Sequence, residues 1–146
     1  MIKVLAFLQN QWFKDPEAAQ RMFDRRPDLR NEYIKRFLFM GCLTGRRLEA
    51  VLGDELCDQI IWEEASPKKA GFSSGVFPAD TEHIKNSIEI HKPEVIICFG
   101  KVASDAIKGM NLTIPILYAP HPTSRQNPMP KLKEAAKALK EIIANG

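Results

Sequence analysis

The stretch Val95-Ile-Ile-Cys-Phe-Gly-Lys-Val-Ala103 decides the fold class of this chain. Its five consecutive apolar residues, Val95–Phe99, predict a strand that is buried on both faces, because a strand with one wet face alternates apolar and polar residues. Gly100 follows directly and predicts a turn into a helix that runs to about Lys108. A buried strand that leads straight into a helix is typical of a parallel sheet covered by helices on both faces.

The rest of the chain continues this alternation of apolar runs and helical patterns. Three further apolar runs predict strands: Ile2–Leu8, Cys57–Trp62 and Ile114–Tyr118. The helical segments are Pro16–Phe39 with a restart at Pro27-Asp28, Gly45–Leu52 closed by Gly53, a helix capped by Asp80 or Thr81 that runs to about His91, and Lys131–Ala144. The stretch Glu63–Pro78 has no clear periodicity and predicts a loop. We therefore predict an α/β protein of three α/β/α layers, with a four-stranded, mainly parallel sheet.

Length and composition bound the organisation of the chain. Its 146 residues, 45% hydrophobic and 27% charged, predict one globular domain over residues 1–146. The net charge of +3 is compatible with a nucleic-acid partner but is not diagnostic of one. No apolar run reaches the length of a membrane span, and the first residues lack the layout of a signal peptide, so we expect no membrane partner and a cytoplasmic location.

The cysteines and histidines show no metal-ligand spacing. Cys42, Cys57 and Cys98 are widely separated, odd in number and form no CxxC pair, which indicates reduced thiols rather than a disulfide or zinc framework. The three histidines are equally dispersed. We therefore expect no metal and no other cofactor.

Three unusual segments directly follow predicted strands: Gln9–Phe13, Gly100–Ala103 and His121–Arg125. Ligands of parallel α/β sheets bind where strands end at their carboxyl edge, so these segments favour one shared site. His121 lies between two prolines, which fix φ and present the imidazole from a stiff turn. A rigid neutral imidazole beside hydroxyls and a guanidinium suits a developing anion or an adjacent phosphate.

These segments, in this order, resemble the uracil-DNA glycosylase superfamily in its thermophile-type and mismatch-type branch. Leu8-Gln-Asn-Gln-Trp12 stands where the family has Gly-Gln-Asp-Pro-Tyr or Asn-Pro-Gly, and His121-Pro-Thr-Ser-Arg125 where it has His-Pro-Ser before a DNA-wedging loop. Phe39-Met-Gly-Cys-Leu-Thr-Gly-Arg-Arg-Leu48 is similar, with one residue extra, to Pro-Phe-x-Gly-x-Ala-Gly-x-x-Leu. Pro93–Ala103 is similar to the family's strand and Gly-x-x-Ala helix start. The resemblance covers most of the chain and implies a uracil-DNA-glycosylase-like domain.

The resemblance implies a monofunctional DNA glycosylase of base excision repair. It would cleave the N-glycosidic bond of an altered base, uracil-like or otherwise deaminated, that is extruded from DNA. Asn10 would orient the attacking water, and His121 would stabilise the negative charge on the departing base. The expected base-binding residues are Gln9, Trp12, Phe39, Glu63 and Glu64. The expected DNA-binding residues, which would hold phosphates or enter the duplex, are Lys101, Thr123, Ser124 and Arg125. We expect a monomer with DNA as its partner.

Three departures from the family pattern bear on these expectations. The four cysteines of the thermophile-type iron–sulfur cluster have no counterpart here, so we expect no cluster. The first motif has Gln11 and Trp12 in place of the usual proline and glycine. Where the family has an Asn that reads uracil, this chain has Trp62-Glu63-Glu64. An ionised carboxylate only accepts hydrogen bonds, so it would suit a base edge rich in donors, and we expect uracil not to be the best substrate.

Most of these residues also have a structural interpretation. Phe39 lies in an apolar run and is a candidate core residue, while Glu63 and Glu64 are candidates for a solvated loop pair. The mixed charges from Lys14 to Arg36 most simply coat a helical surface. Two other functional classes stay open. One is a non-catalytic nucleic-acid or nucleotide-binding relative of the same fold, and the other is a small nucleotide-processing α/β enzyme unrelated to repair.

Overall fold

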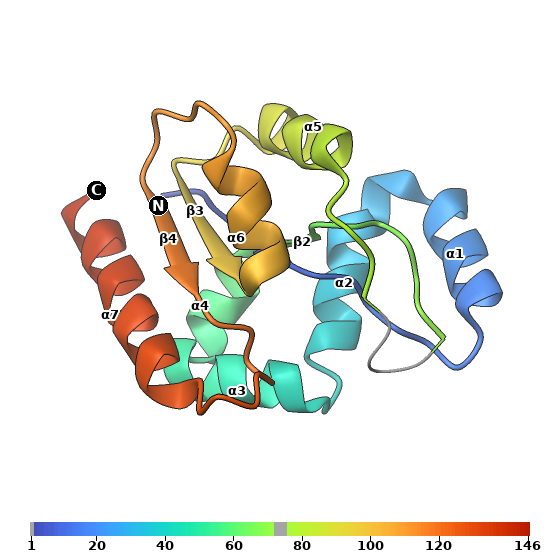
Figure 1. Cartoon of the computed structure of the whole chain (residues 1–146), viewed down its shortest axis with the longest axis horizontal. Coiled ribbons are helices and arrows are strands. Elements are labelled where there is room, and N and C mark those ends of the chain that lie inside the picture. Colours follow the sequence, from blue (N-terminus) through green and yellow to red (C-terminus); the bar gives the residue numbers. More distant parts are fainter. Residues whose placement is uncertain (1, 72–75) are drawn as a thin grey trace.

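A parallel sheet forms the centre of the computed structural model, which describes residues 2–71 and 76–146 (Figure 1). Its strands are β1 (Val4–Leu8), β2 (Ile61–Glu64), β3 (Val95–Phe99) and β4 (Ile116–Ala119). Their order across the sheet is β2-β1-β3-β4, and every neighbouring pair is parallel. The predicted α/β class with a four-stranded parallel sheet is confirmed.

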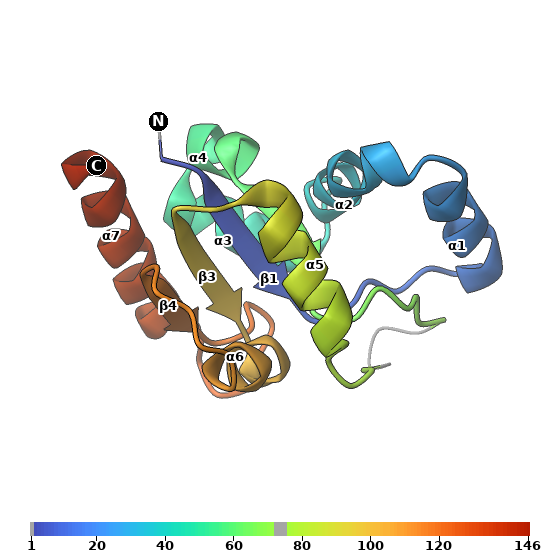
Figure 2. The same ribbon diagram turned by 90° about the horizontal axis from the view of Figure 1, so that it is seen from above.

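Helices occupy the connections between the strands and cover both faces of the sheet. They are α1 (Pro16–Arg25), the short 3-10 helix η1 (Pro27–Leu29), α2 (Arg30–Leu38), α3 (Leu43–Leu52), α4 (Asp54–Gln59), α5 (Thr81–His91), α6 (Lys101–Lys108) and α7 (Met129–Asn145). Figure 2 shows α5 and α6 on one face and α3 and α4 on the other, with α7 beside β4 and α1 outside α2. The three-layer arrangement is thus the predicted one.

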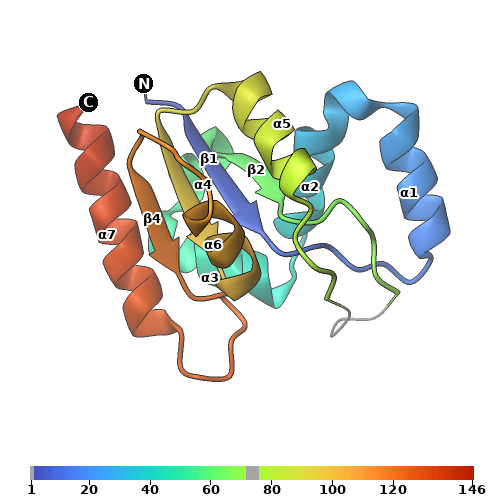
Figure 3. The same ribbon diagram turned by 45° about the horizontal axis from the view of Figure 1, so that its top comes forward.

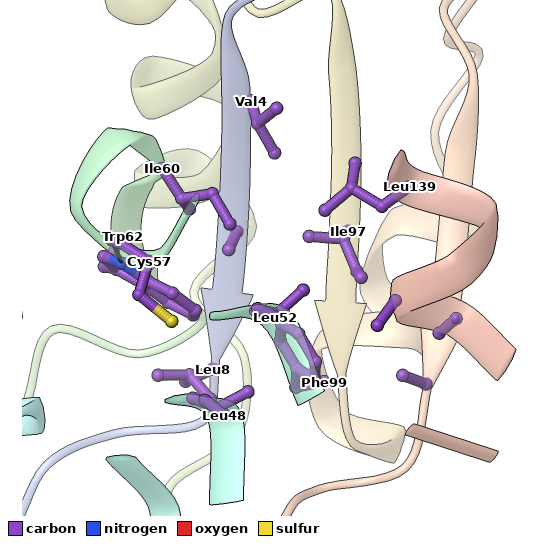
Figure 4. Close-up of a cluster of buried hydrophobic side chains, with 14 of the residues drawn as sticks. Val4, Leu8, Leu48, Leu52, Cys57, Ile60, Trp62, Ile97, Phe99 and Leu139 are labelled. Carbon is purple, nitrogen blue, oxygen red and sulfur yellow. Dashed lines mark hydrogen bonds between the residues drawn. The ribbon is translucent and has the colours of Figure 1, made fainter. Parts of the chain in front are cut away.

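Each face of the sheet carries its own apolar cluster, as strands that are apolar throughout require. The even-numbered residues of β1 pack with side chains of α2, α3, α4 and α7, whereas its odd-numbered residues pack with side chains of α5 and α6. Figure 4 shows the first cluster around Trp62 and Phe99, whose rings stack with their centroids 6.1 Å apart. The side-chain alternation of an extended strand therefore divides one apolar run between two cores.

Local sequence signals explain where several helices begin and how closely they approach. The Oδ1 atom of Asp80 accepts a hydrogen bond from the amide of His83 at 3.1 Å, so Asp80 caps α5, one of the two predicted caps. Gly45 lies where α3 crosses the end of α2. A Cβ atom at Gly45 would overlap the carbonyl oxygen of Leu38, so only glycine permits this approach.

The strand predicted over Cys57–Trp62 is wrong in its first half. Cys57 belongs to α4, and β2 begins only at Ile61 and continues through Glu63 and Glu64, which were expected in a loop. The acidic residues at the start of α4 favour a helix N-terminus. The two glutamates extend the strand because basic side chains neutralise them, as described below. The remainder of the predicted loop, apart from residues 72–75 outside the described ranges, contains no helix or strand.

Candidate functional site

The carboxyl ends of β1, β3 and β4 bring together loops that are far apart in the sequence (Figure 3). Because all strands are parallel, each ends at the same edge of the sheet. A Cβ atom built on Gly100 would lie 3.3 Å from the Cβ of His121 and 3.5 Å from the Nε2 of Gln9. Gln9, Gly100 and His121 therefore meet at one place, which we call the rim site.

Gly100 makes this close meeting possible through its backbone. Its φ of 97° and ψ of 163° lie in a region that side-chain-bearing residues almost never adopt. Its amide donates to the carbonyl oxygen of Ala119 at 2.8 Å, which joins the end of β3 to the end of β4. The turn predicted at Gly100 therefore also forms the part of the rim site against which His121 and Gln9 lie.

The hydrogen bonds of His121 define which ring nitrogen carries the proton. The backbone amide of Thr123 donates to Nδ1 of His121 at 3.2 Å, and the Thr123 hydroxyl lies 2.9 Å from the same atom. An amide N–H can only donate, so Nδ1 is an acceptor and the neutral ring carries its proton on Nε2. Burial lowers the pKa of His121, which favours this neutral form. His121 therefore offers a single N–H donor at Nε2.

A link to α3 holds the turn that carries His121. The Nη1 atom of Arg47 donates to the carbonyl oxygen of Pro122 at 2.6 Å. The amide of Ser124 donates to the carbonyl oxygen of His121 at 3.0 Å, which closes the turn on itself. Sequence reasoning did not assign this anchoring role to Arg47, because the two residues are 75 positions apart.

The residues predicted to contact DNA lie at the start of α6 and in the loop after β4, next to Gly100 and His121. Lys101 begins α6 directly after Gly100 and is exposed. Thr123 and Arg125 are exposed, and Ser124 is half-buried. The structure therefore brings the predicted phosphate-binding side chains to the same edge of the sheet as His121.

Asn10 follows Gln9 in the loop after β1, and its side chain takes part in loop–loop contacts. Its Oδ1 atom accepts from the amide of Phe77 at 3.2 Å, and its Nδ2 atom donates to the carbonyl oxygen of Gln11 at 3.4 Å. Asn10 thus holds two loops together next to the rim site. Its role in orienting a water stays a prediction.

Trp12 and Phe39 were both expected to contact a base, but within residues 2–71 and 76–146 the contacts that the structure gives them lie outside the rim site. The Trp12 side chain is 49% exposed, and its backbone pairs in an isolated bridge with Ala70. The Phe39 ring packs edge-on against Trp62 at 5.4 Å and lines a surface pocket of about 510 Å³ between α2, α3 and α4. The structure supports the alternative interpretation of Phe39 as part of the core.

Glu63 and Glu64 are buried, with exposures of 2% and 0%, and their oxygens are occupied by other side chains. Arg30 Nη2 lies 2.8 Å from Glu63 Oε1 and 2.9 Å from Glu64 Oε1. Lys69 Nζ lies 2.5 Å from Glu64 Oε1, and His83 Nε2 lies 3.0 Å from Glu63 Oε1. The structure supports neither the expected base-reading role nor the expected solvated loop pair. We call these five residues the buried ion network.

The charges of the buried ion network are mutually stabilised. Burial by itself raises the pKa of Glu63, but hydrogen bonds from His83 and Arg30 and the charge of Arg30 hold it down to about 2. Burial lowers the pKa of Lys69, and the charge of Glu64 opposes that shift. Arg30 was expected on a solvated helical surface. Its place in this network could not be predicted from the sequence, because its partners lie 33 and 34 residues away.

The described residues contain no group of three or more His, Cys, Asp and Glu side chains placed to hold a metal ion. Cys57 and Cys98 belong to the clusters on opposite faces of the sheet, and burial raises the pKa of each thiol to about 12. Within these residues no helix has the length and apolar character needed to cross a bilayer. Comparisons of the chain with models of protein families, with curated proteins and with solved structures give no match.

Proposed function

We propose that this protein is a DNA glycosylase that hydrolyses the N-glycosidic bond of an altered, uracil-like base extruded from DNA. The observation that carries the proposal is the neutral imidazole of His121, which carries its proton on Nε2 and lies beside Gln9 and Gly100. Negative charge develops on a pyrimidine base as its glycosidic bond breaks. A fixed hydrogen-bond donor at that place lowers the barrier, because it stabilises charge that exists mainly in the transition state.

The proposed reaction is a hydrolysis, in which the sugar gains a hydroxyl group and the base gains a proton, both from one water molecule. The electron pair of the glycosidic bond leaves with the base, where the Nε2–H of His121 stabilises it. The oxygen of a water molecule bonds to the anomeric carbon, and its released proton neutralises the base. Asn10 would orient this water, since an amide is too weak a base to remove its proton.

The charge distribution around the rim site supports DNA as the substrate. Lys101 at the start of α6 and Arg125 in the loop after β4 are both exposed, and the chain carries a net charge of +3. Lysine and arginine contacts to phosphates supply most of the sequence-independent affinity of DNA-binding proteins. Extruding the base would bring it to the rim site, which a stacked base cannot reach.

The residue that indicates which base is bound belongs to the rim site and is not Glu63 or Glu64. Because Glu63 and Glu64 are occupied within the buried ion network, they give no reason to prefer a base edge rich in donors. Gln9 carries an amide, which both donates and accepts, and this is the chemistry that a uracil edge requires. We therefore place uracil first among the candidate bases.

The proposal is tested by an abasic-site assay on a panel of single- and double-stranded oligonucleotides. The panel carries uracil, hypoxanthine, xanthine and 5-hydroxymethyluracil, each opposite every normal base. Strand breakage after alkali, and its loss in His121→Ala, is the expected result for at least one base. An unmodified duplex is the control. Duplex binding with no breakage on any member of the panel would overturn the enzymatic proposal.

A nucleic-acid-binding module without catalytic activity is the second candidate function. It is favoured by the side chain of Asn10, whose Oδ1 and Nδ2 atoms both bond to backbone groups of the surrounding loops. A module of this kind would bind duplex DNA with a strong salt dependence and release no base. Binding of free nucleotides without duplex binding would instead favour a nucleotide-processing enzyme.

A further inference from the structure

The buried ion network reaches the rim site through one hydrogen bond. The backbone amide of Gln11 donates to Oε2 of Glu64 at 2.7 Å. Gln11 belongs to the loop that carries Gln9 and Asn10, and the bond spans 53 residues of sequence. A buried carboxylate is thus attached directly to the loop that forms one side of the rim site.

Backbone bonds hold only the first part of this loop to β2. The amides of Ala65 and Ser66 donate to the carbonyl oxygens of Leu8 and Gln9 at 2.7 and 3.0 Å, which continues the parallel ladder. Beyond Gln9 the ladder with β2 ends, and the next bond to that strand is the one from the Gln11 amide to Glu64. Gln11 is also held outside β2, because its carbonyl oxygen accepts from the amide of Ala70 at 3.1 Å and its Nε2 atom donates to the carbonyl oxygen of Ile34 at 3.3 Å. Asn10 therefore lies between a ladder bond and the side-chain bond of Glu64.

We propose that Glu64 is a positioning residue, which fixes the loop of residues 9–11 and so holds Gln9 in the rim site and Asn10 beside it. Arg30 and Lys69 hold its Oε1 atom, and Gln11 is bound to its Oε2 atom. The two cations thus act on the site through a single carboxylate. The kinetic part of this inference rests on the proposed function, whereas the structural part does not.

The chemistry of the three partners explains why a carboxylate is needed at this position. Both oxygens of Glu64 face donors, and an ionised carboxylate accepts at both. An amide of the same size would accept at one end and donate at the other. In Glu64→Gln the NH₂ group would therefore face either the two cations or the Gln11 amide, and the loop attachment is lost or weakened in both orientations.

Glu63 provides a matched control in the same strand. It is equally buried and shares Arg30 with Glu64. Its carboxylate also accepts from Asn31 and His83, and its partners in the described part of the chain lie outside the loop of residues 9–11. Glu63→Gln therefore also replaces a carboxylate of the buried ion network by an amide, but it removes no bond to that loop.

Hydrogen exchange of the Gln11 amide tests the attachment without any need for activity. In the wild type this amide should be protected, and in Glu64→Gln its exchange should speed up by about tenfold or more, because a hydrogen bond to a charged group is lost. In Glu63→Gln, compared under conditions where both variants are folded, it should stay protected. An unprotected Gln11 amide in the wild type, or equal acceleration in both variants, would overturn the inference. Even if Glu64→Gln does not fold, the protection of the Gln11 amide in the wild type tests whether this amide is bonded to Glu64.

Single-turnover and steady-state kinetics test the consequence for the site. We expect Glu64→Gln to lower kcat by about 10²-fold with KM little changed, since a small displacement of a positioning loop costs about this much. Glu63→Gln should keep kcat within a few-fold of the wild type. Faster Gln11 exchange together with an unchanged kcat would refute the positioning role. Absence of excision by the wild type would instead count against the proposed function and leave the exchange result standing.

Discussion

Gly100 and His121 approach so closely that a Cβ atom on the glycine would lie 3.3 Å from the Cβ of the histidine. The contact joins the end of β3 to the loop after β4. It depends on the backbone of Gly100, whose φ of 97° is accessible to glycine and strained for other residues. The position of the imidazole is therefore coupled to the absence of a side chain at residue 100.

We predict that Gly100→Ala lowers both stability and excision. The strained backbone should cost about 1–3 kcal/mol of unfolding free energy, and the displaced imidazole should lower kcat by about 10²-fold. Gly53→Ala is the matched control, because Gly53 has a φ of 87° and nothing within 4 Å of a built Cβ. Denaturant unfolding and single-turnover excision measure the two effects. If Gly53→Ala impairs excision as much as Gly100→Ala, the loss reflects backbone strain and not the contact with His121.

His121→Ala should lower the rate of base excision by about 10²–10³-fold, the usual loss for one donor to a developing anion. Duplex binding should change little, since phosphate contacts dominate affinity. His91→Ala is the control, because it also removes an imidazole but lies at the end of α5 that leads into the start of β3, at the opposite edge of the sheet. We expect that control to stay within a few-fold of wild-type excision. An unchanged rate in His121→Ala would favour the binding-module alternative.

Excision should depend on pH through the neutral form of His121. Burial lowers the pKa of this group below its ordinary value of 6.5, so the neutral ring is already the major form in the folded protein at that pH. We expect the rate to decline as the pH falls and the ring gains a proton, with the midpoint of the decline below pH 6.5. A decline already centred above pH 6.5 would show that another group controls the reaction.

Arg125→Ala should weaken DNA binding uniformly across sequences and reduce the slope of log K against log salt by about 1, as expected for one lost phosphate contact. The exposed Lys3 precedes β1 at the opposite edge of the sheet, so Lys3→Ala is the control. Fluorescence anisotropy at several salt concentrations gives both slopes. Equal slopes for the two variants would place Arg125 outside the DNA interface.

The buried ion network should make stability sensitive to acid. The pKa of Glu63 is about 2 in the folded protein against an ordinary 4.5, so its stabilising effect is complete above pH 4.5 and is lost as the pH falls towards 2. The difference corresponds to a contribution on the order of 3 kcal/mol. Glu63→Gln should flatten the unfolding free energy against pH over this interval, measured by urea denaturation. A pH profile parallel to that of the wild type would contradict the assignment.

Much of the fold is determined by the sequence alone, because continuous apolar runs that alternate with amphipathic segments are stable in few arrangements. Val95–Phe99 has no polar residue to present to water, so both its faces need helices. Parallel strands end at one edge, and this geometry alone predicts that Gly100 and His121 lie close together. The pattern of apolar residues and the positions of glycine and proline were sufficient to predict these features.

Tertiary structure decided which charges are buried and how the site is supported. A glutamate in a sequence indicates exposure, because an unpaired buried carboxylate is too costly. Glu63 and Glu64 escape this cost through Arg30, which lies more than thirty residues earlier in the chain. Their burial, the extension of β2 and the attachment of Gln11 therefore all depend on long-range pairs. No local pattern encodes such pairs, because their free energy exists only once the chain has brought the opposite charges together.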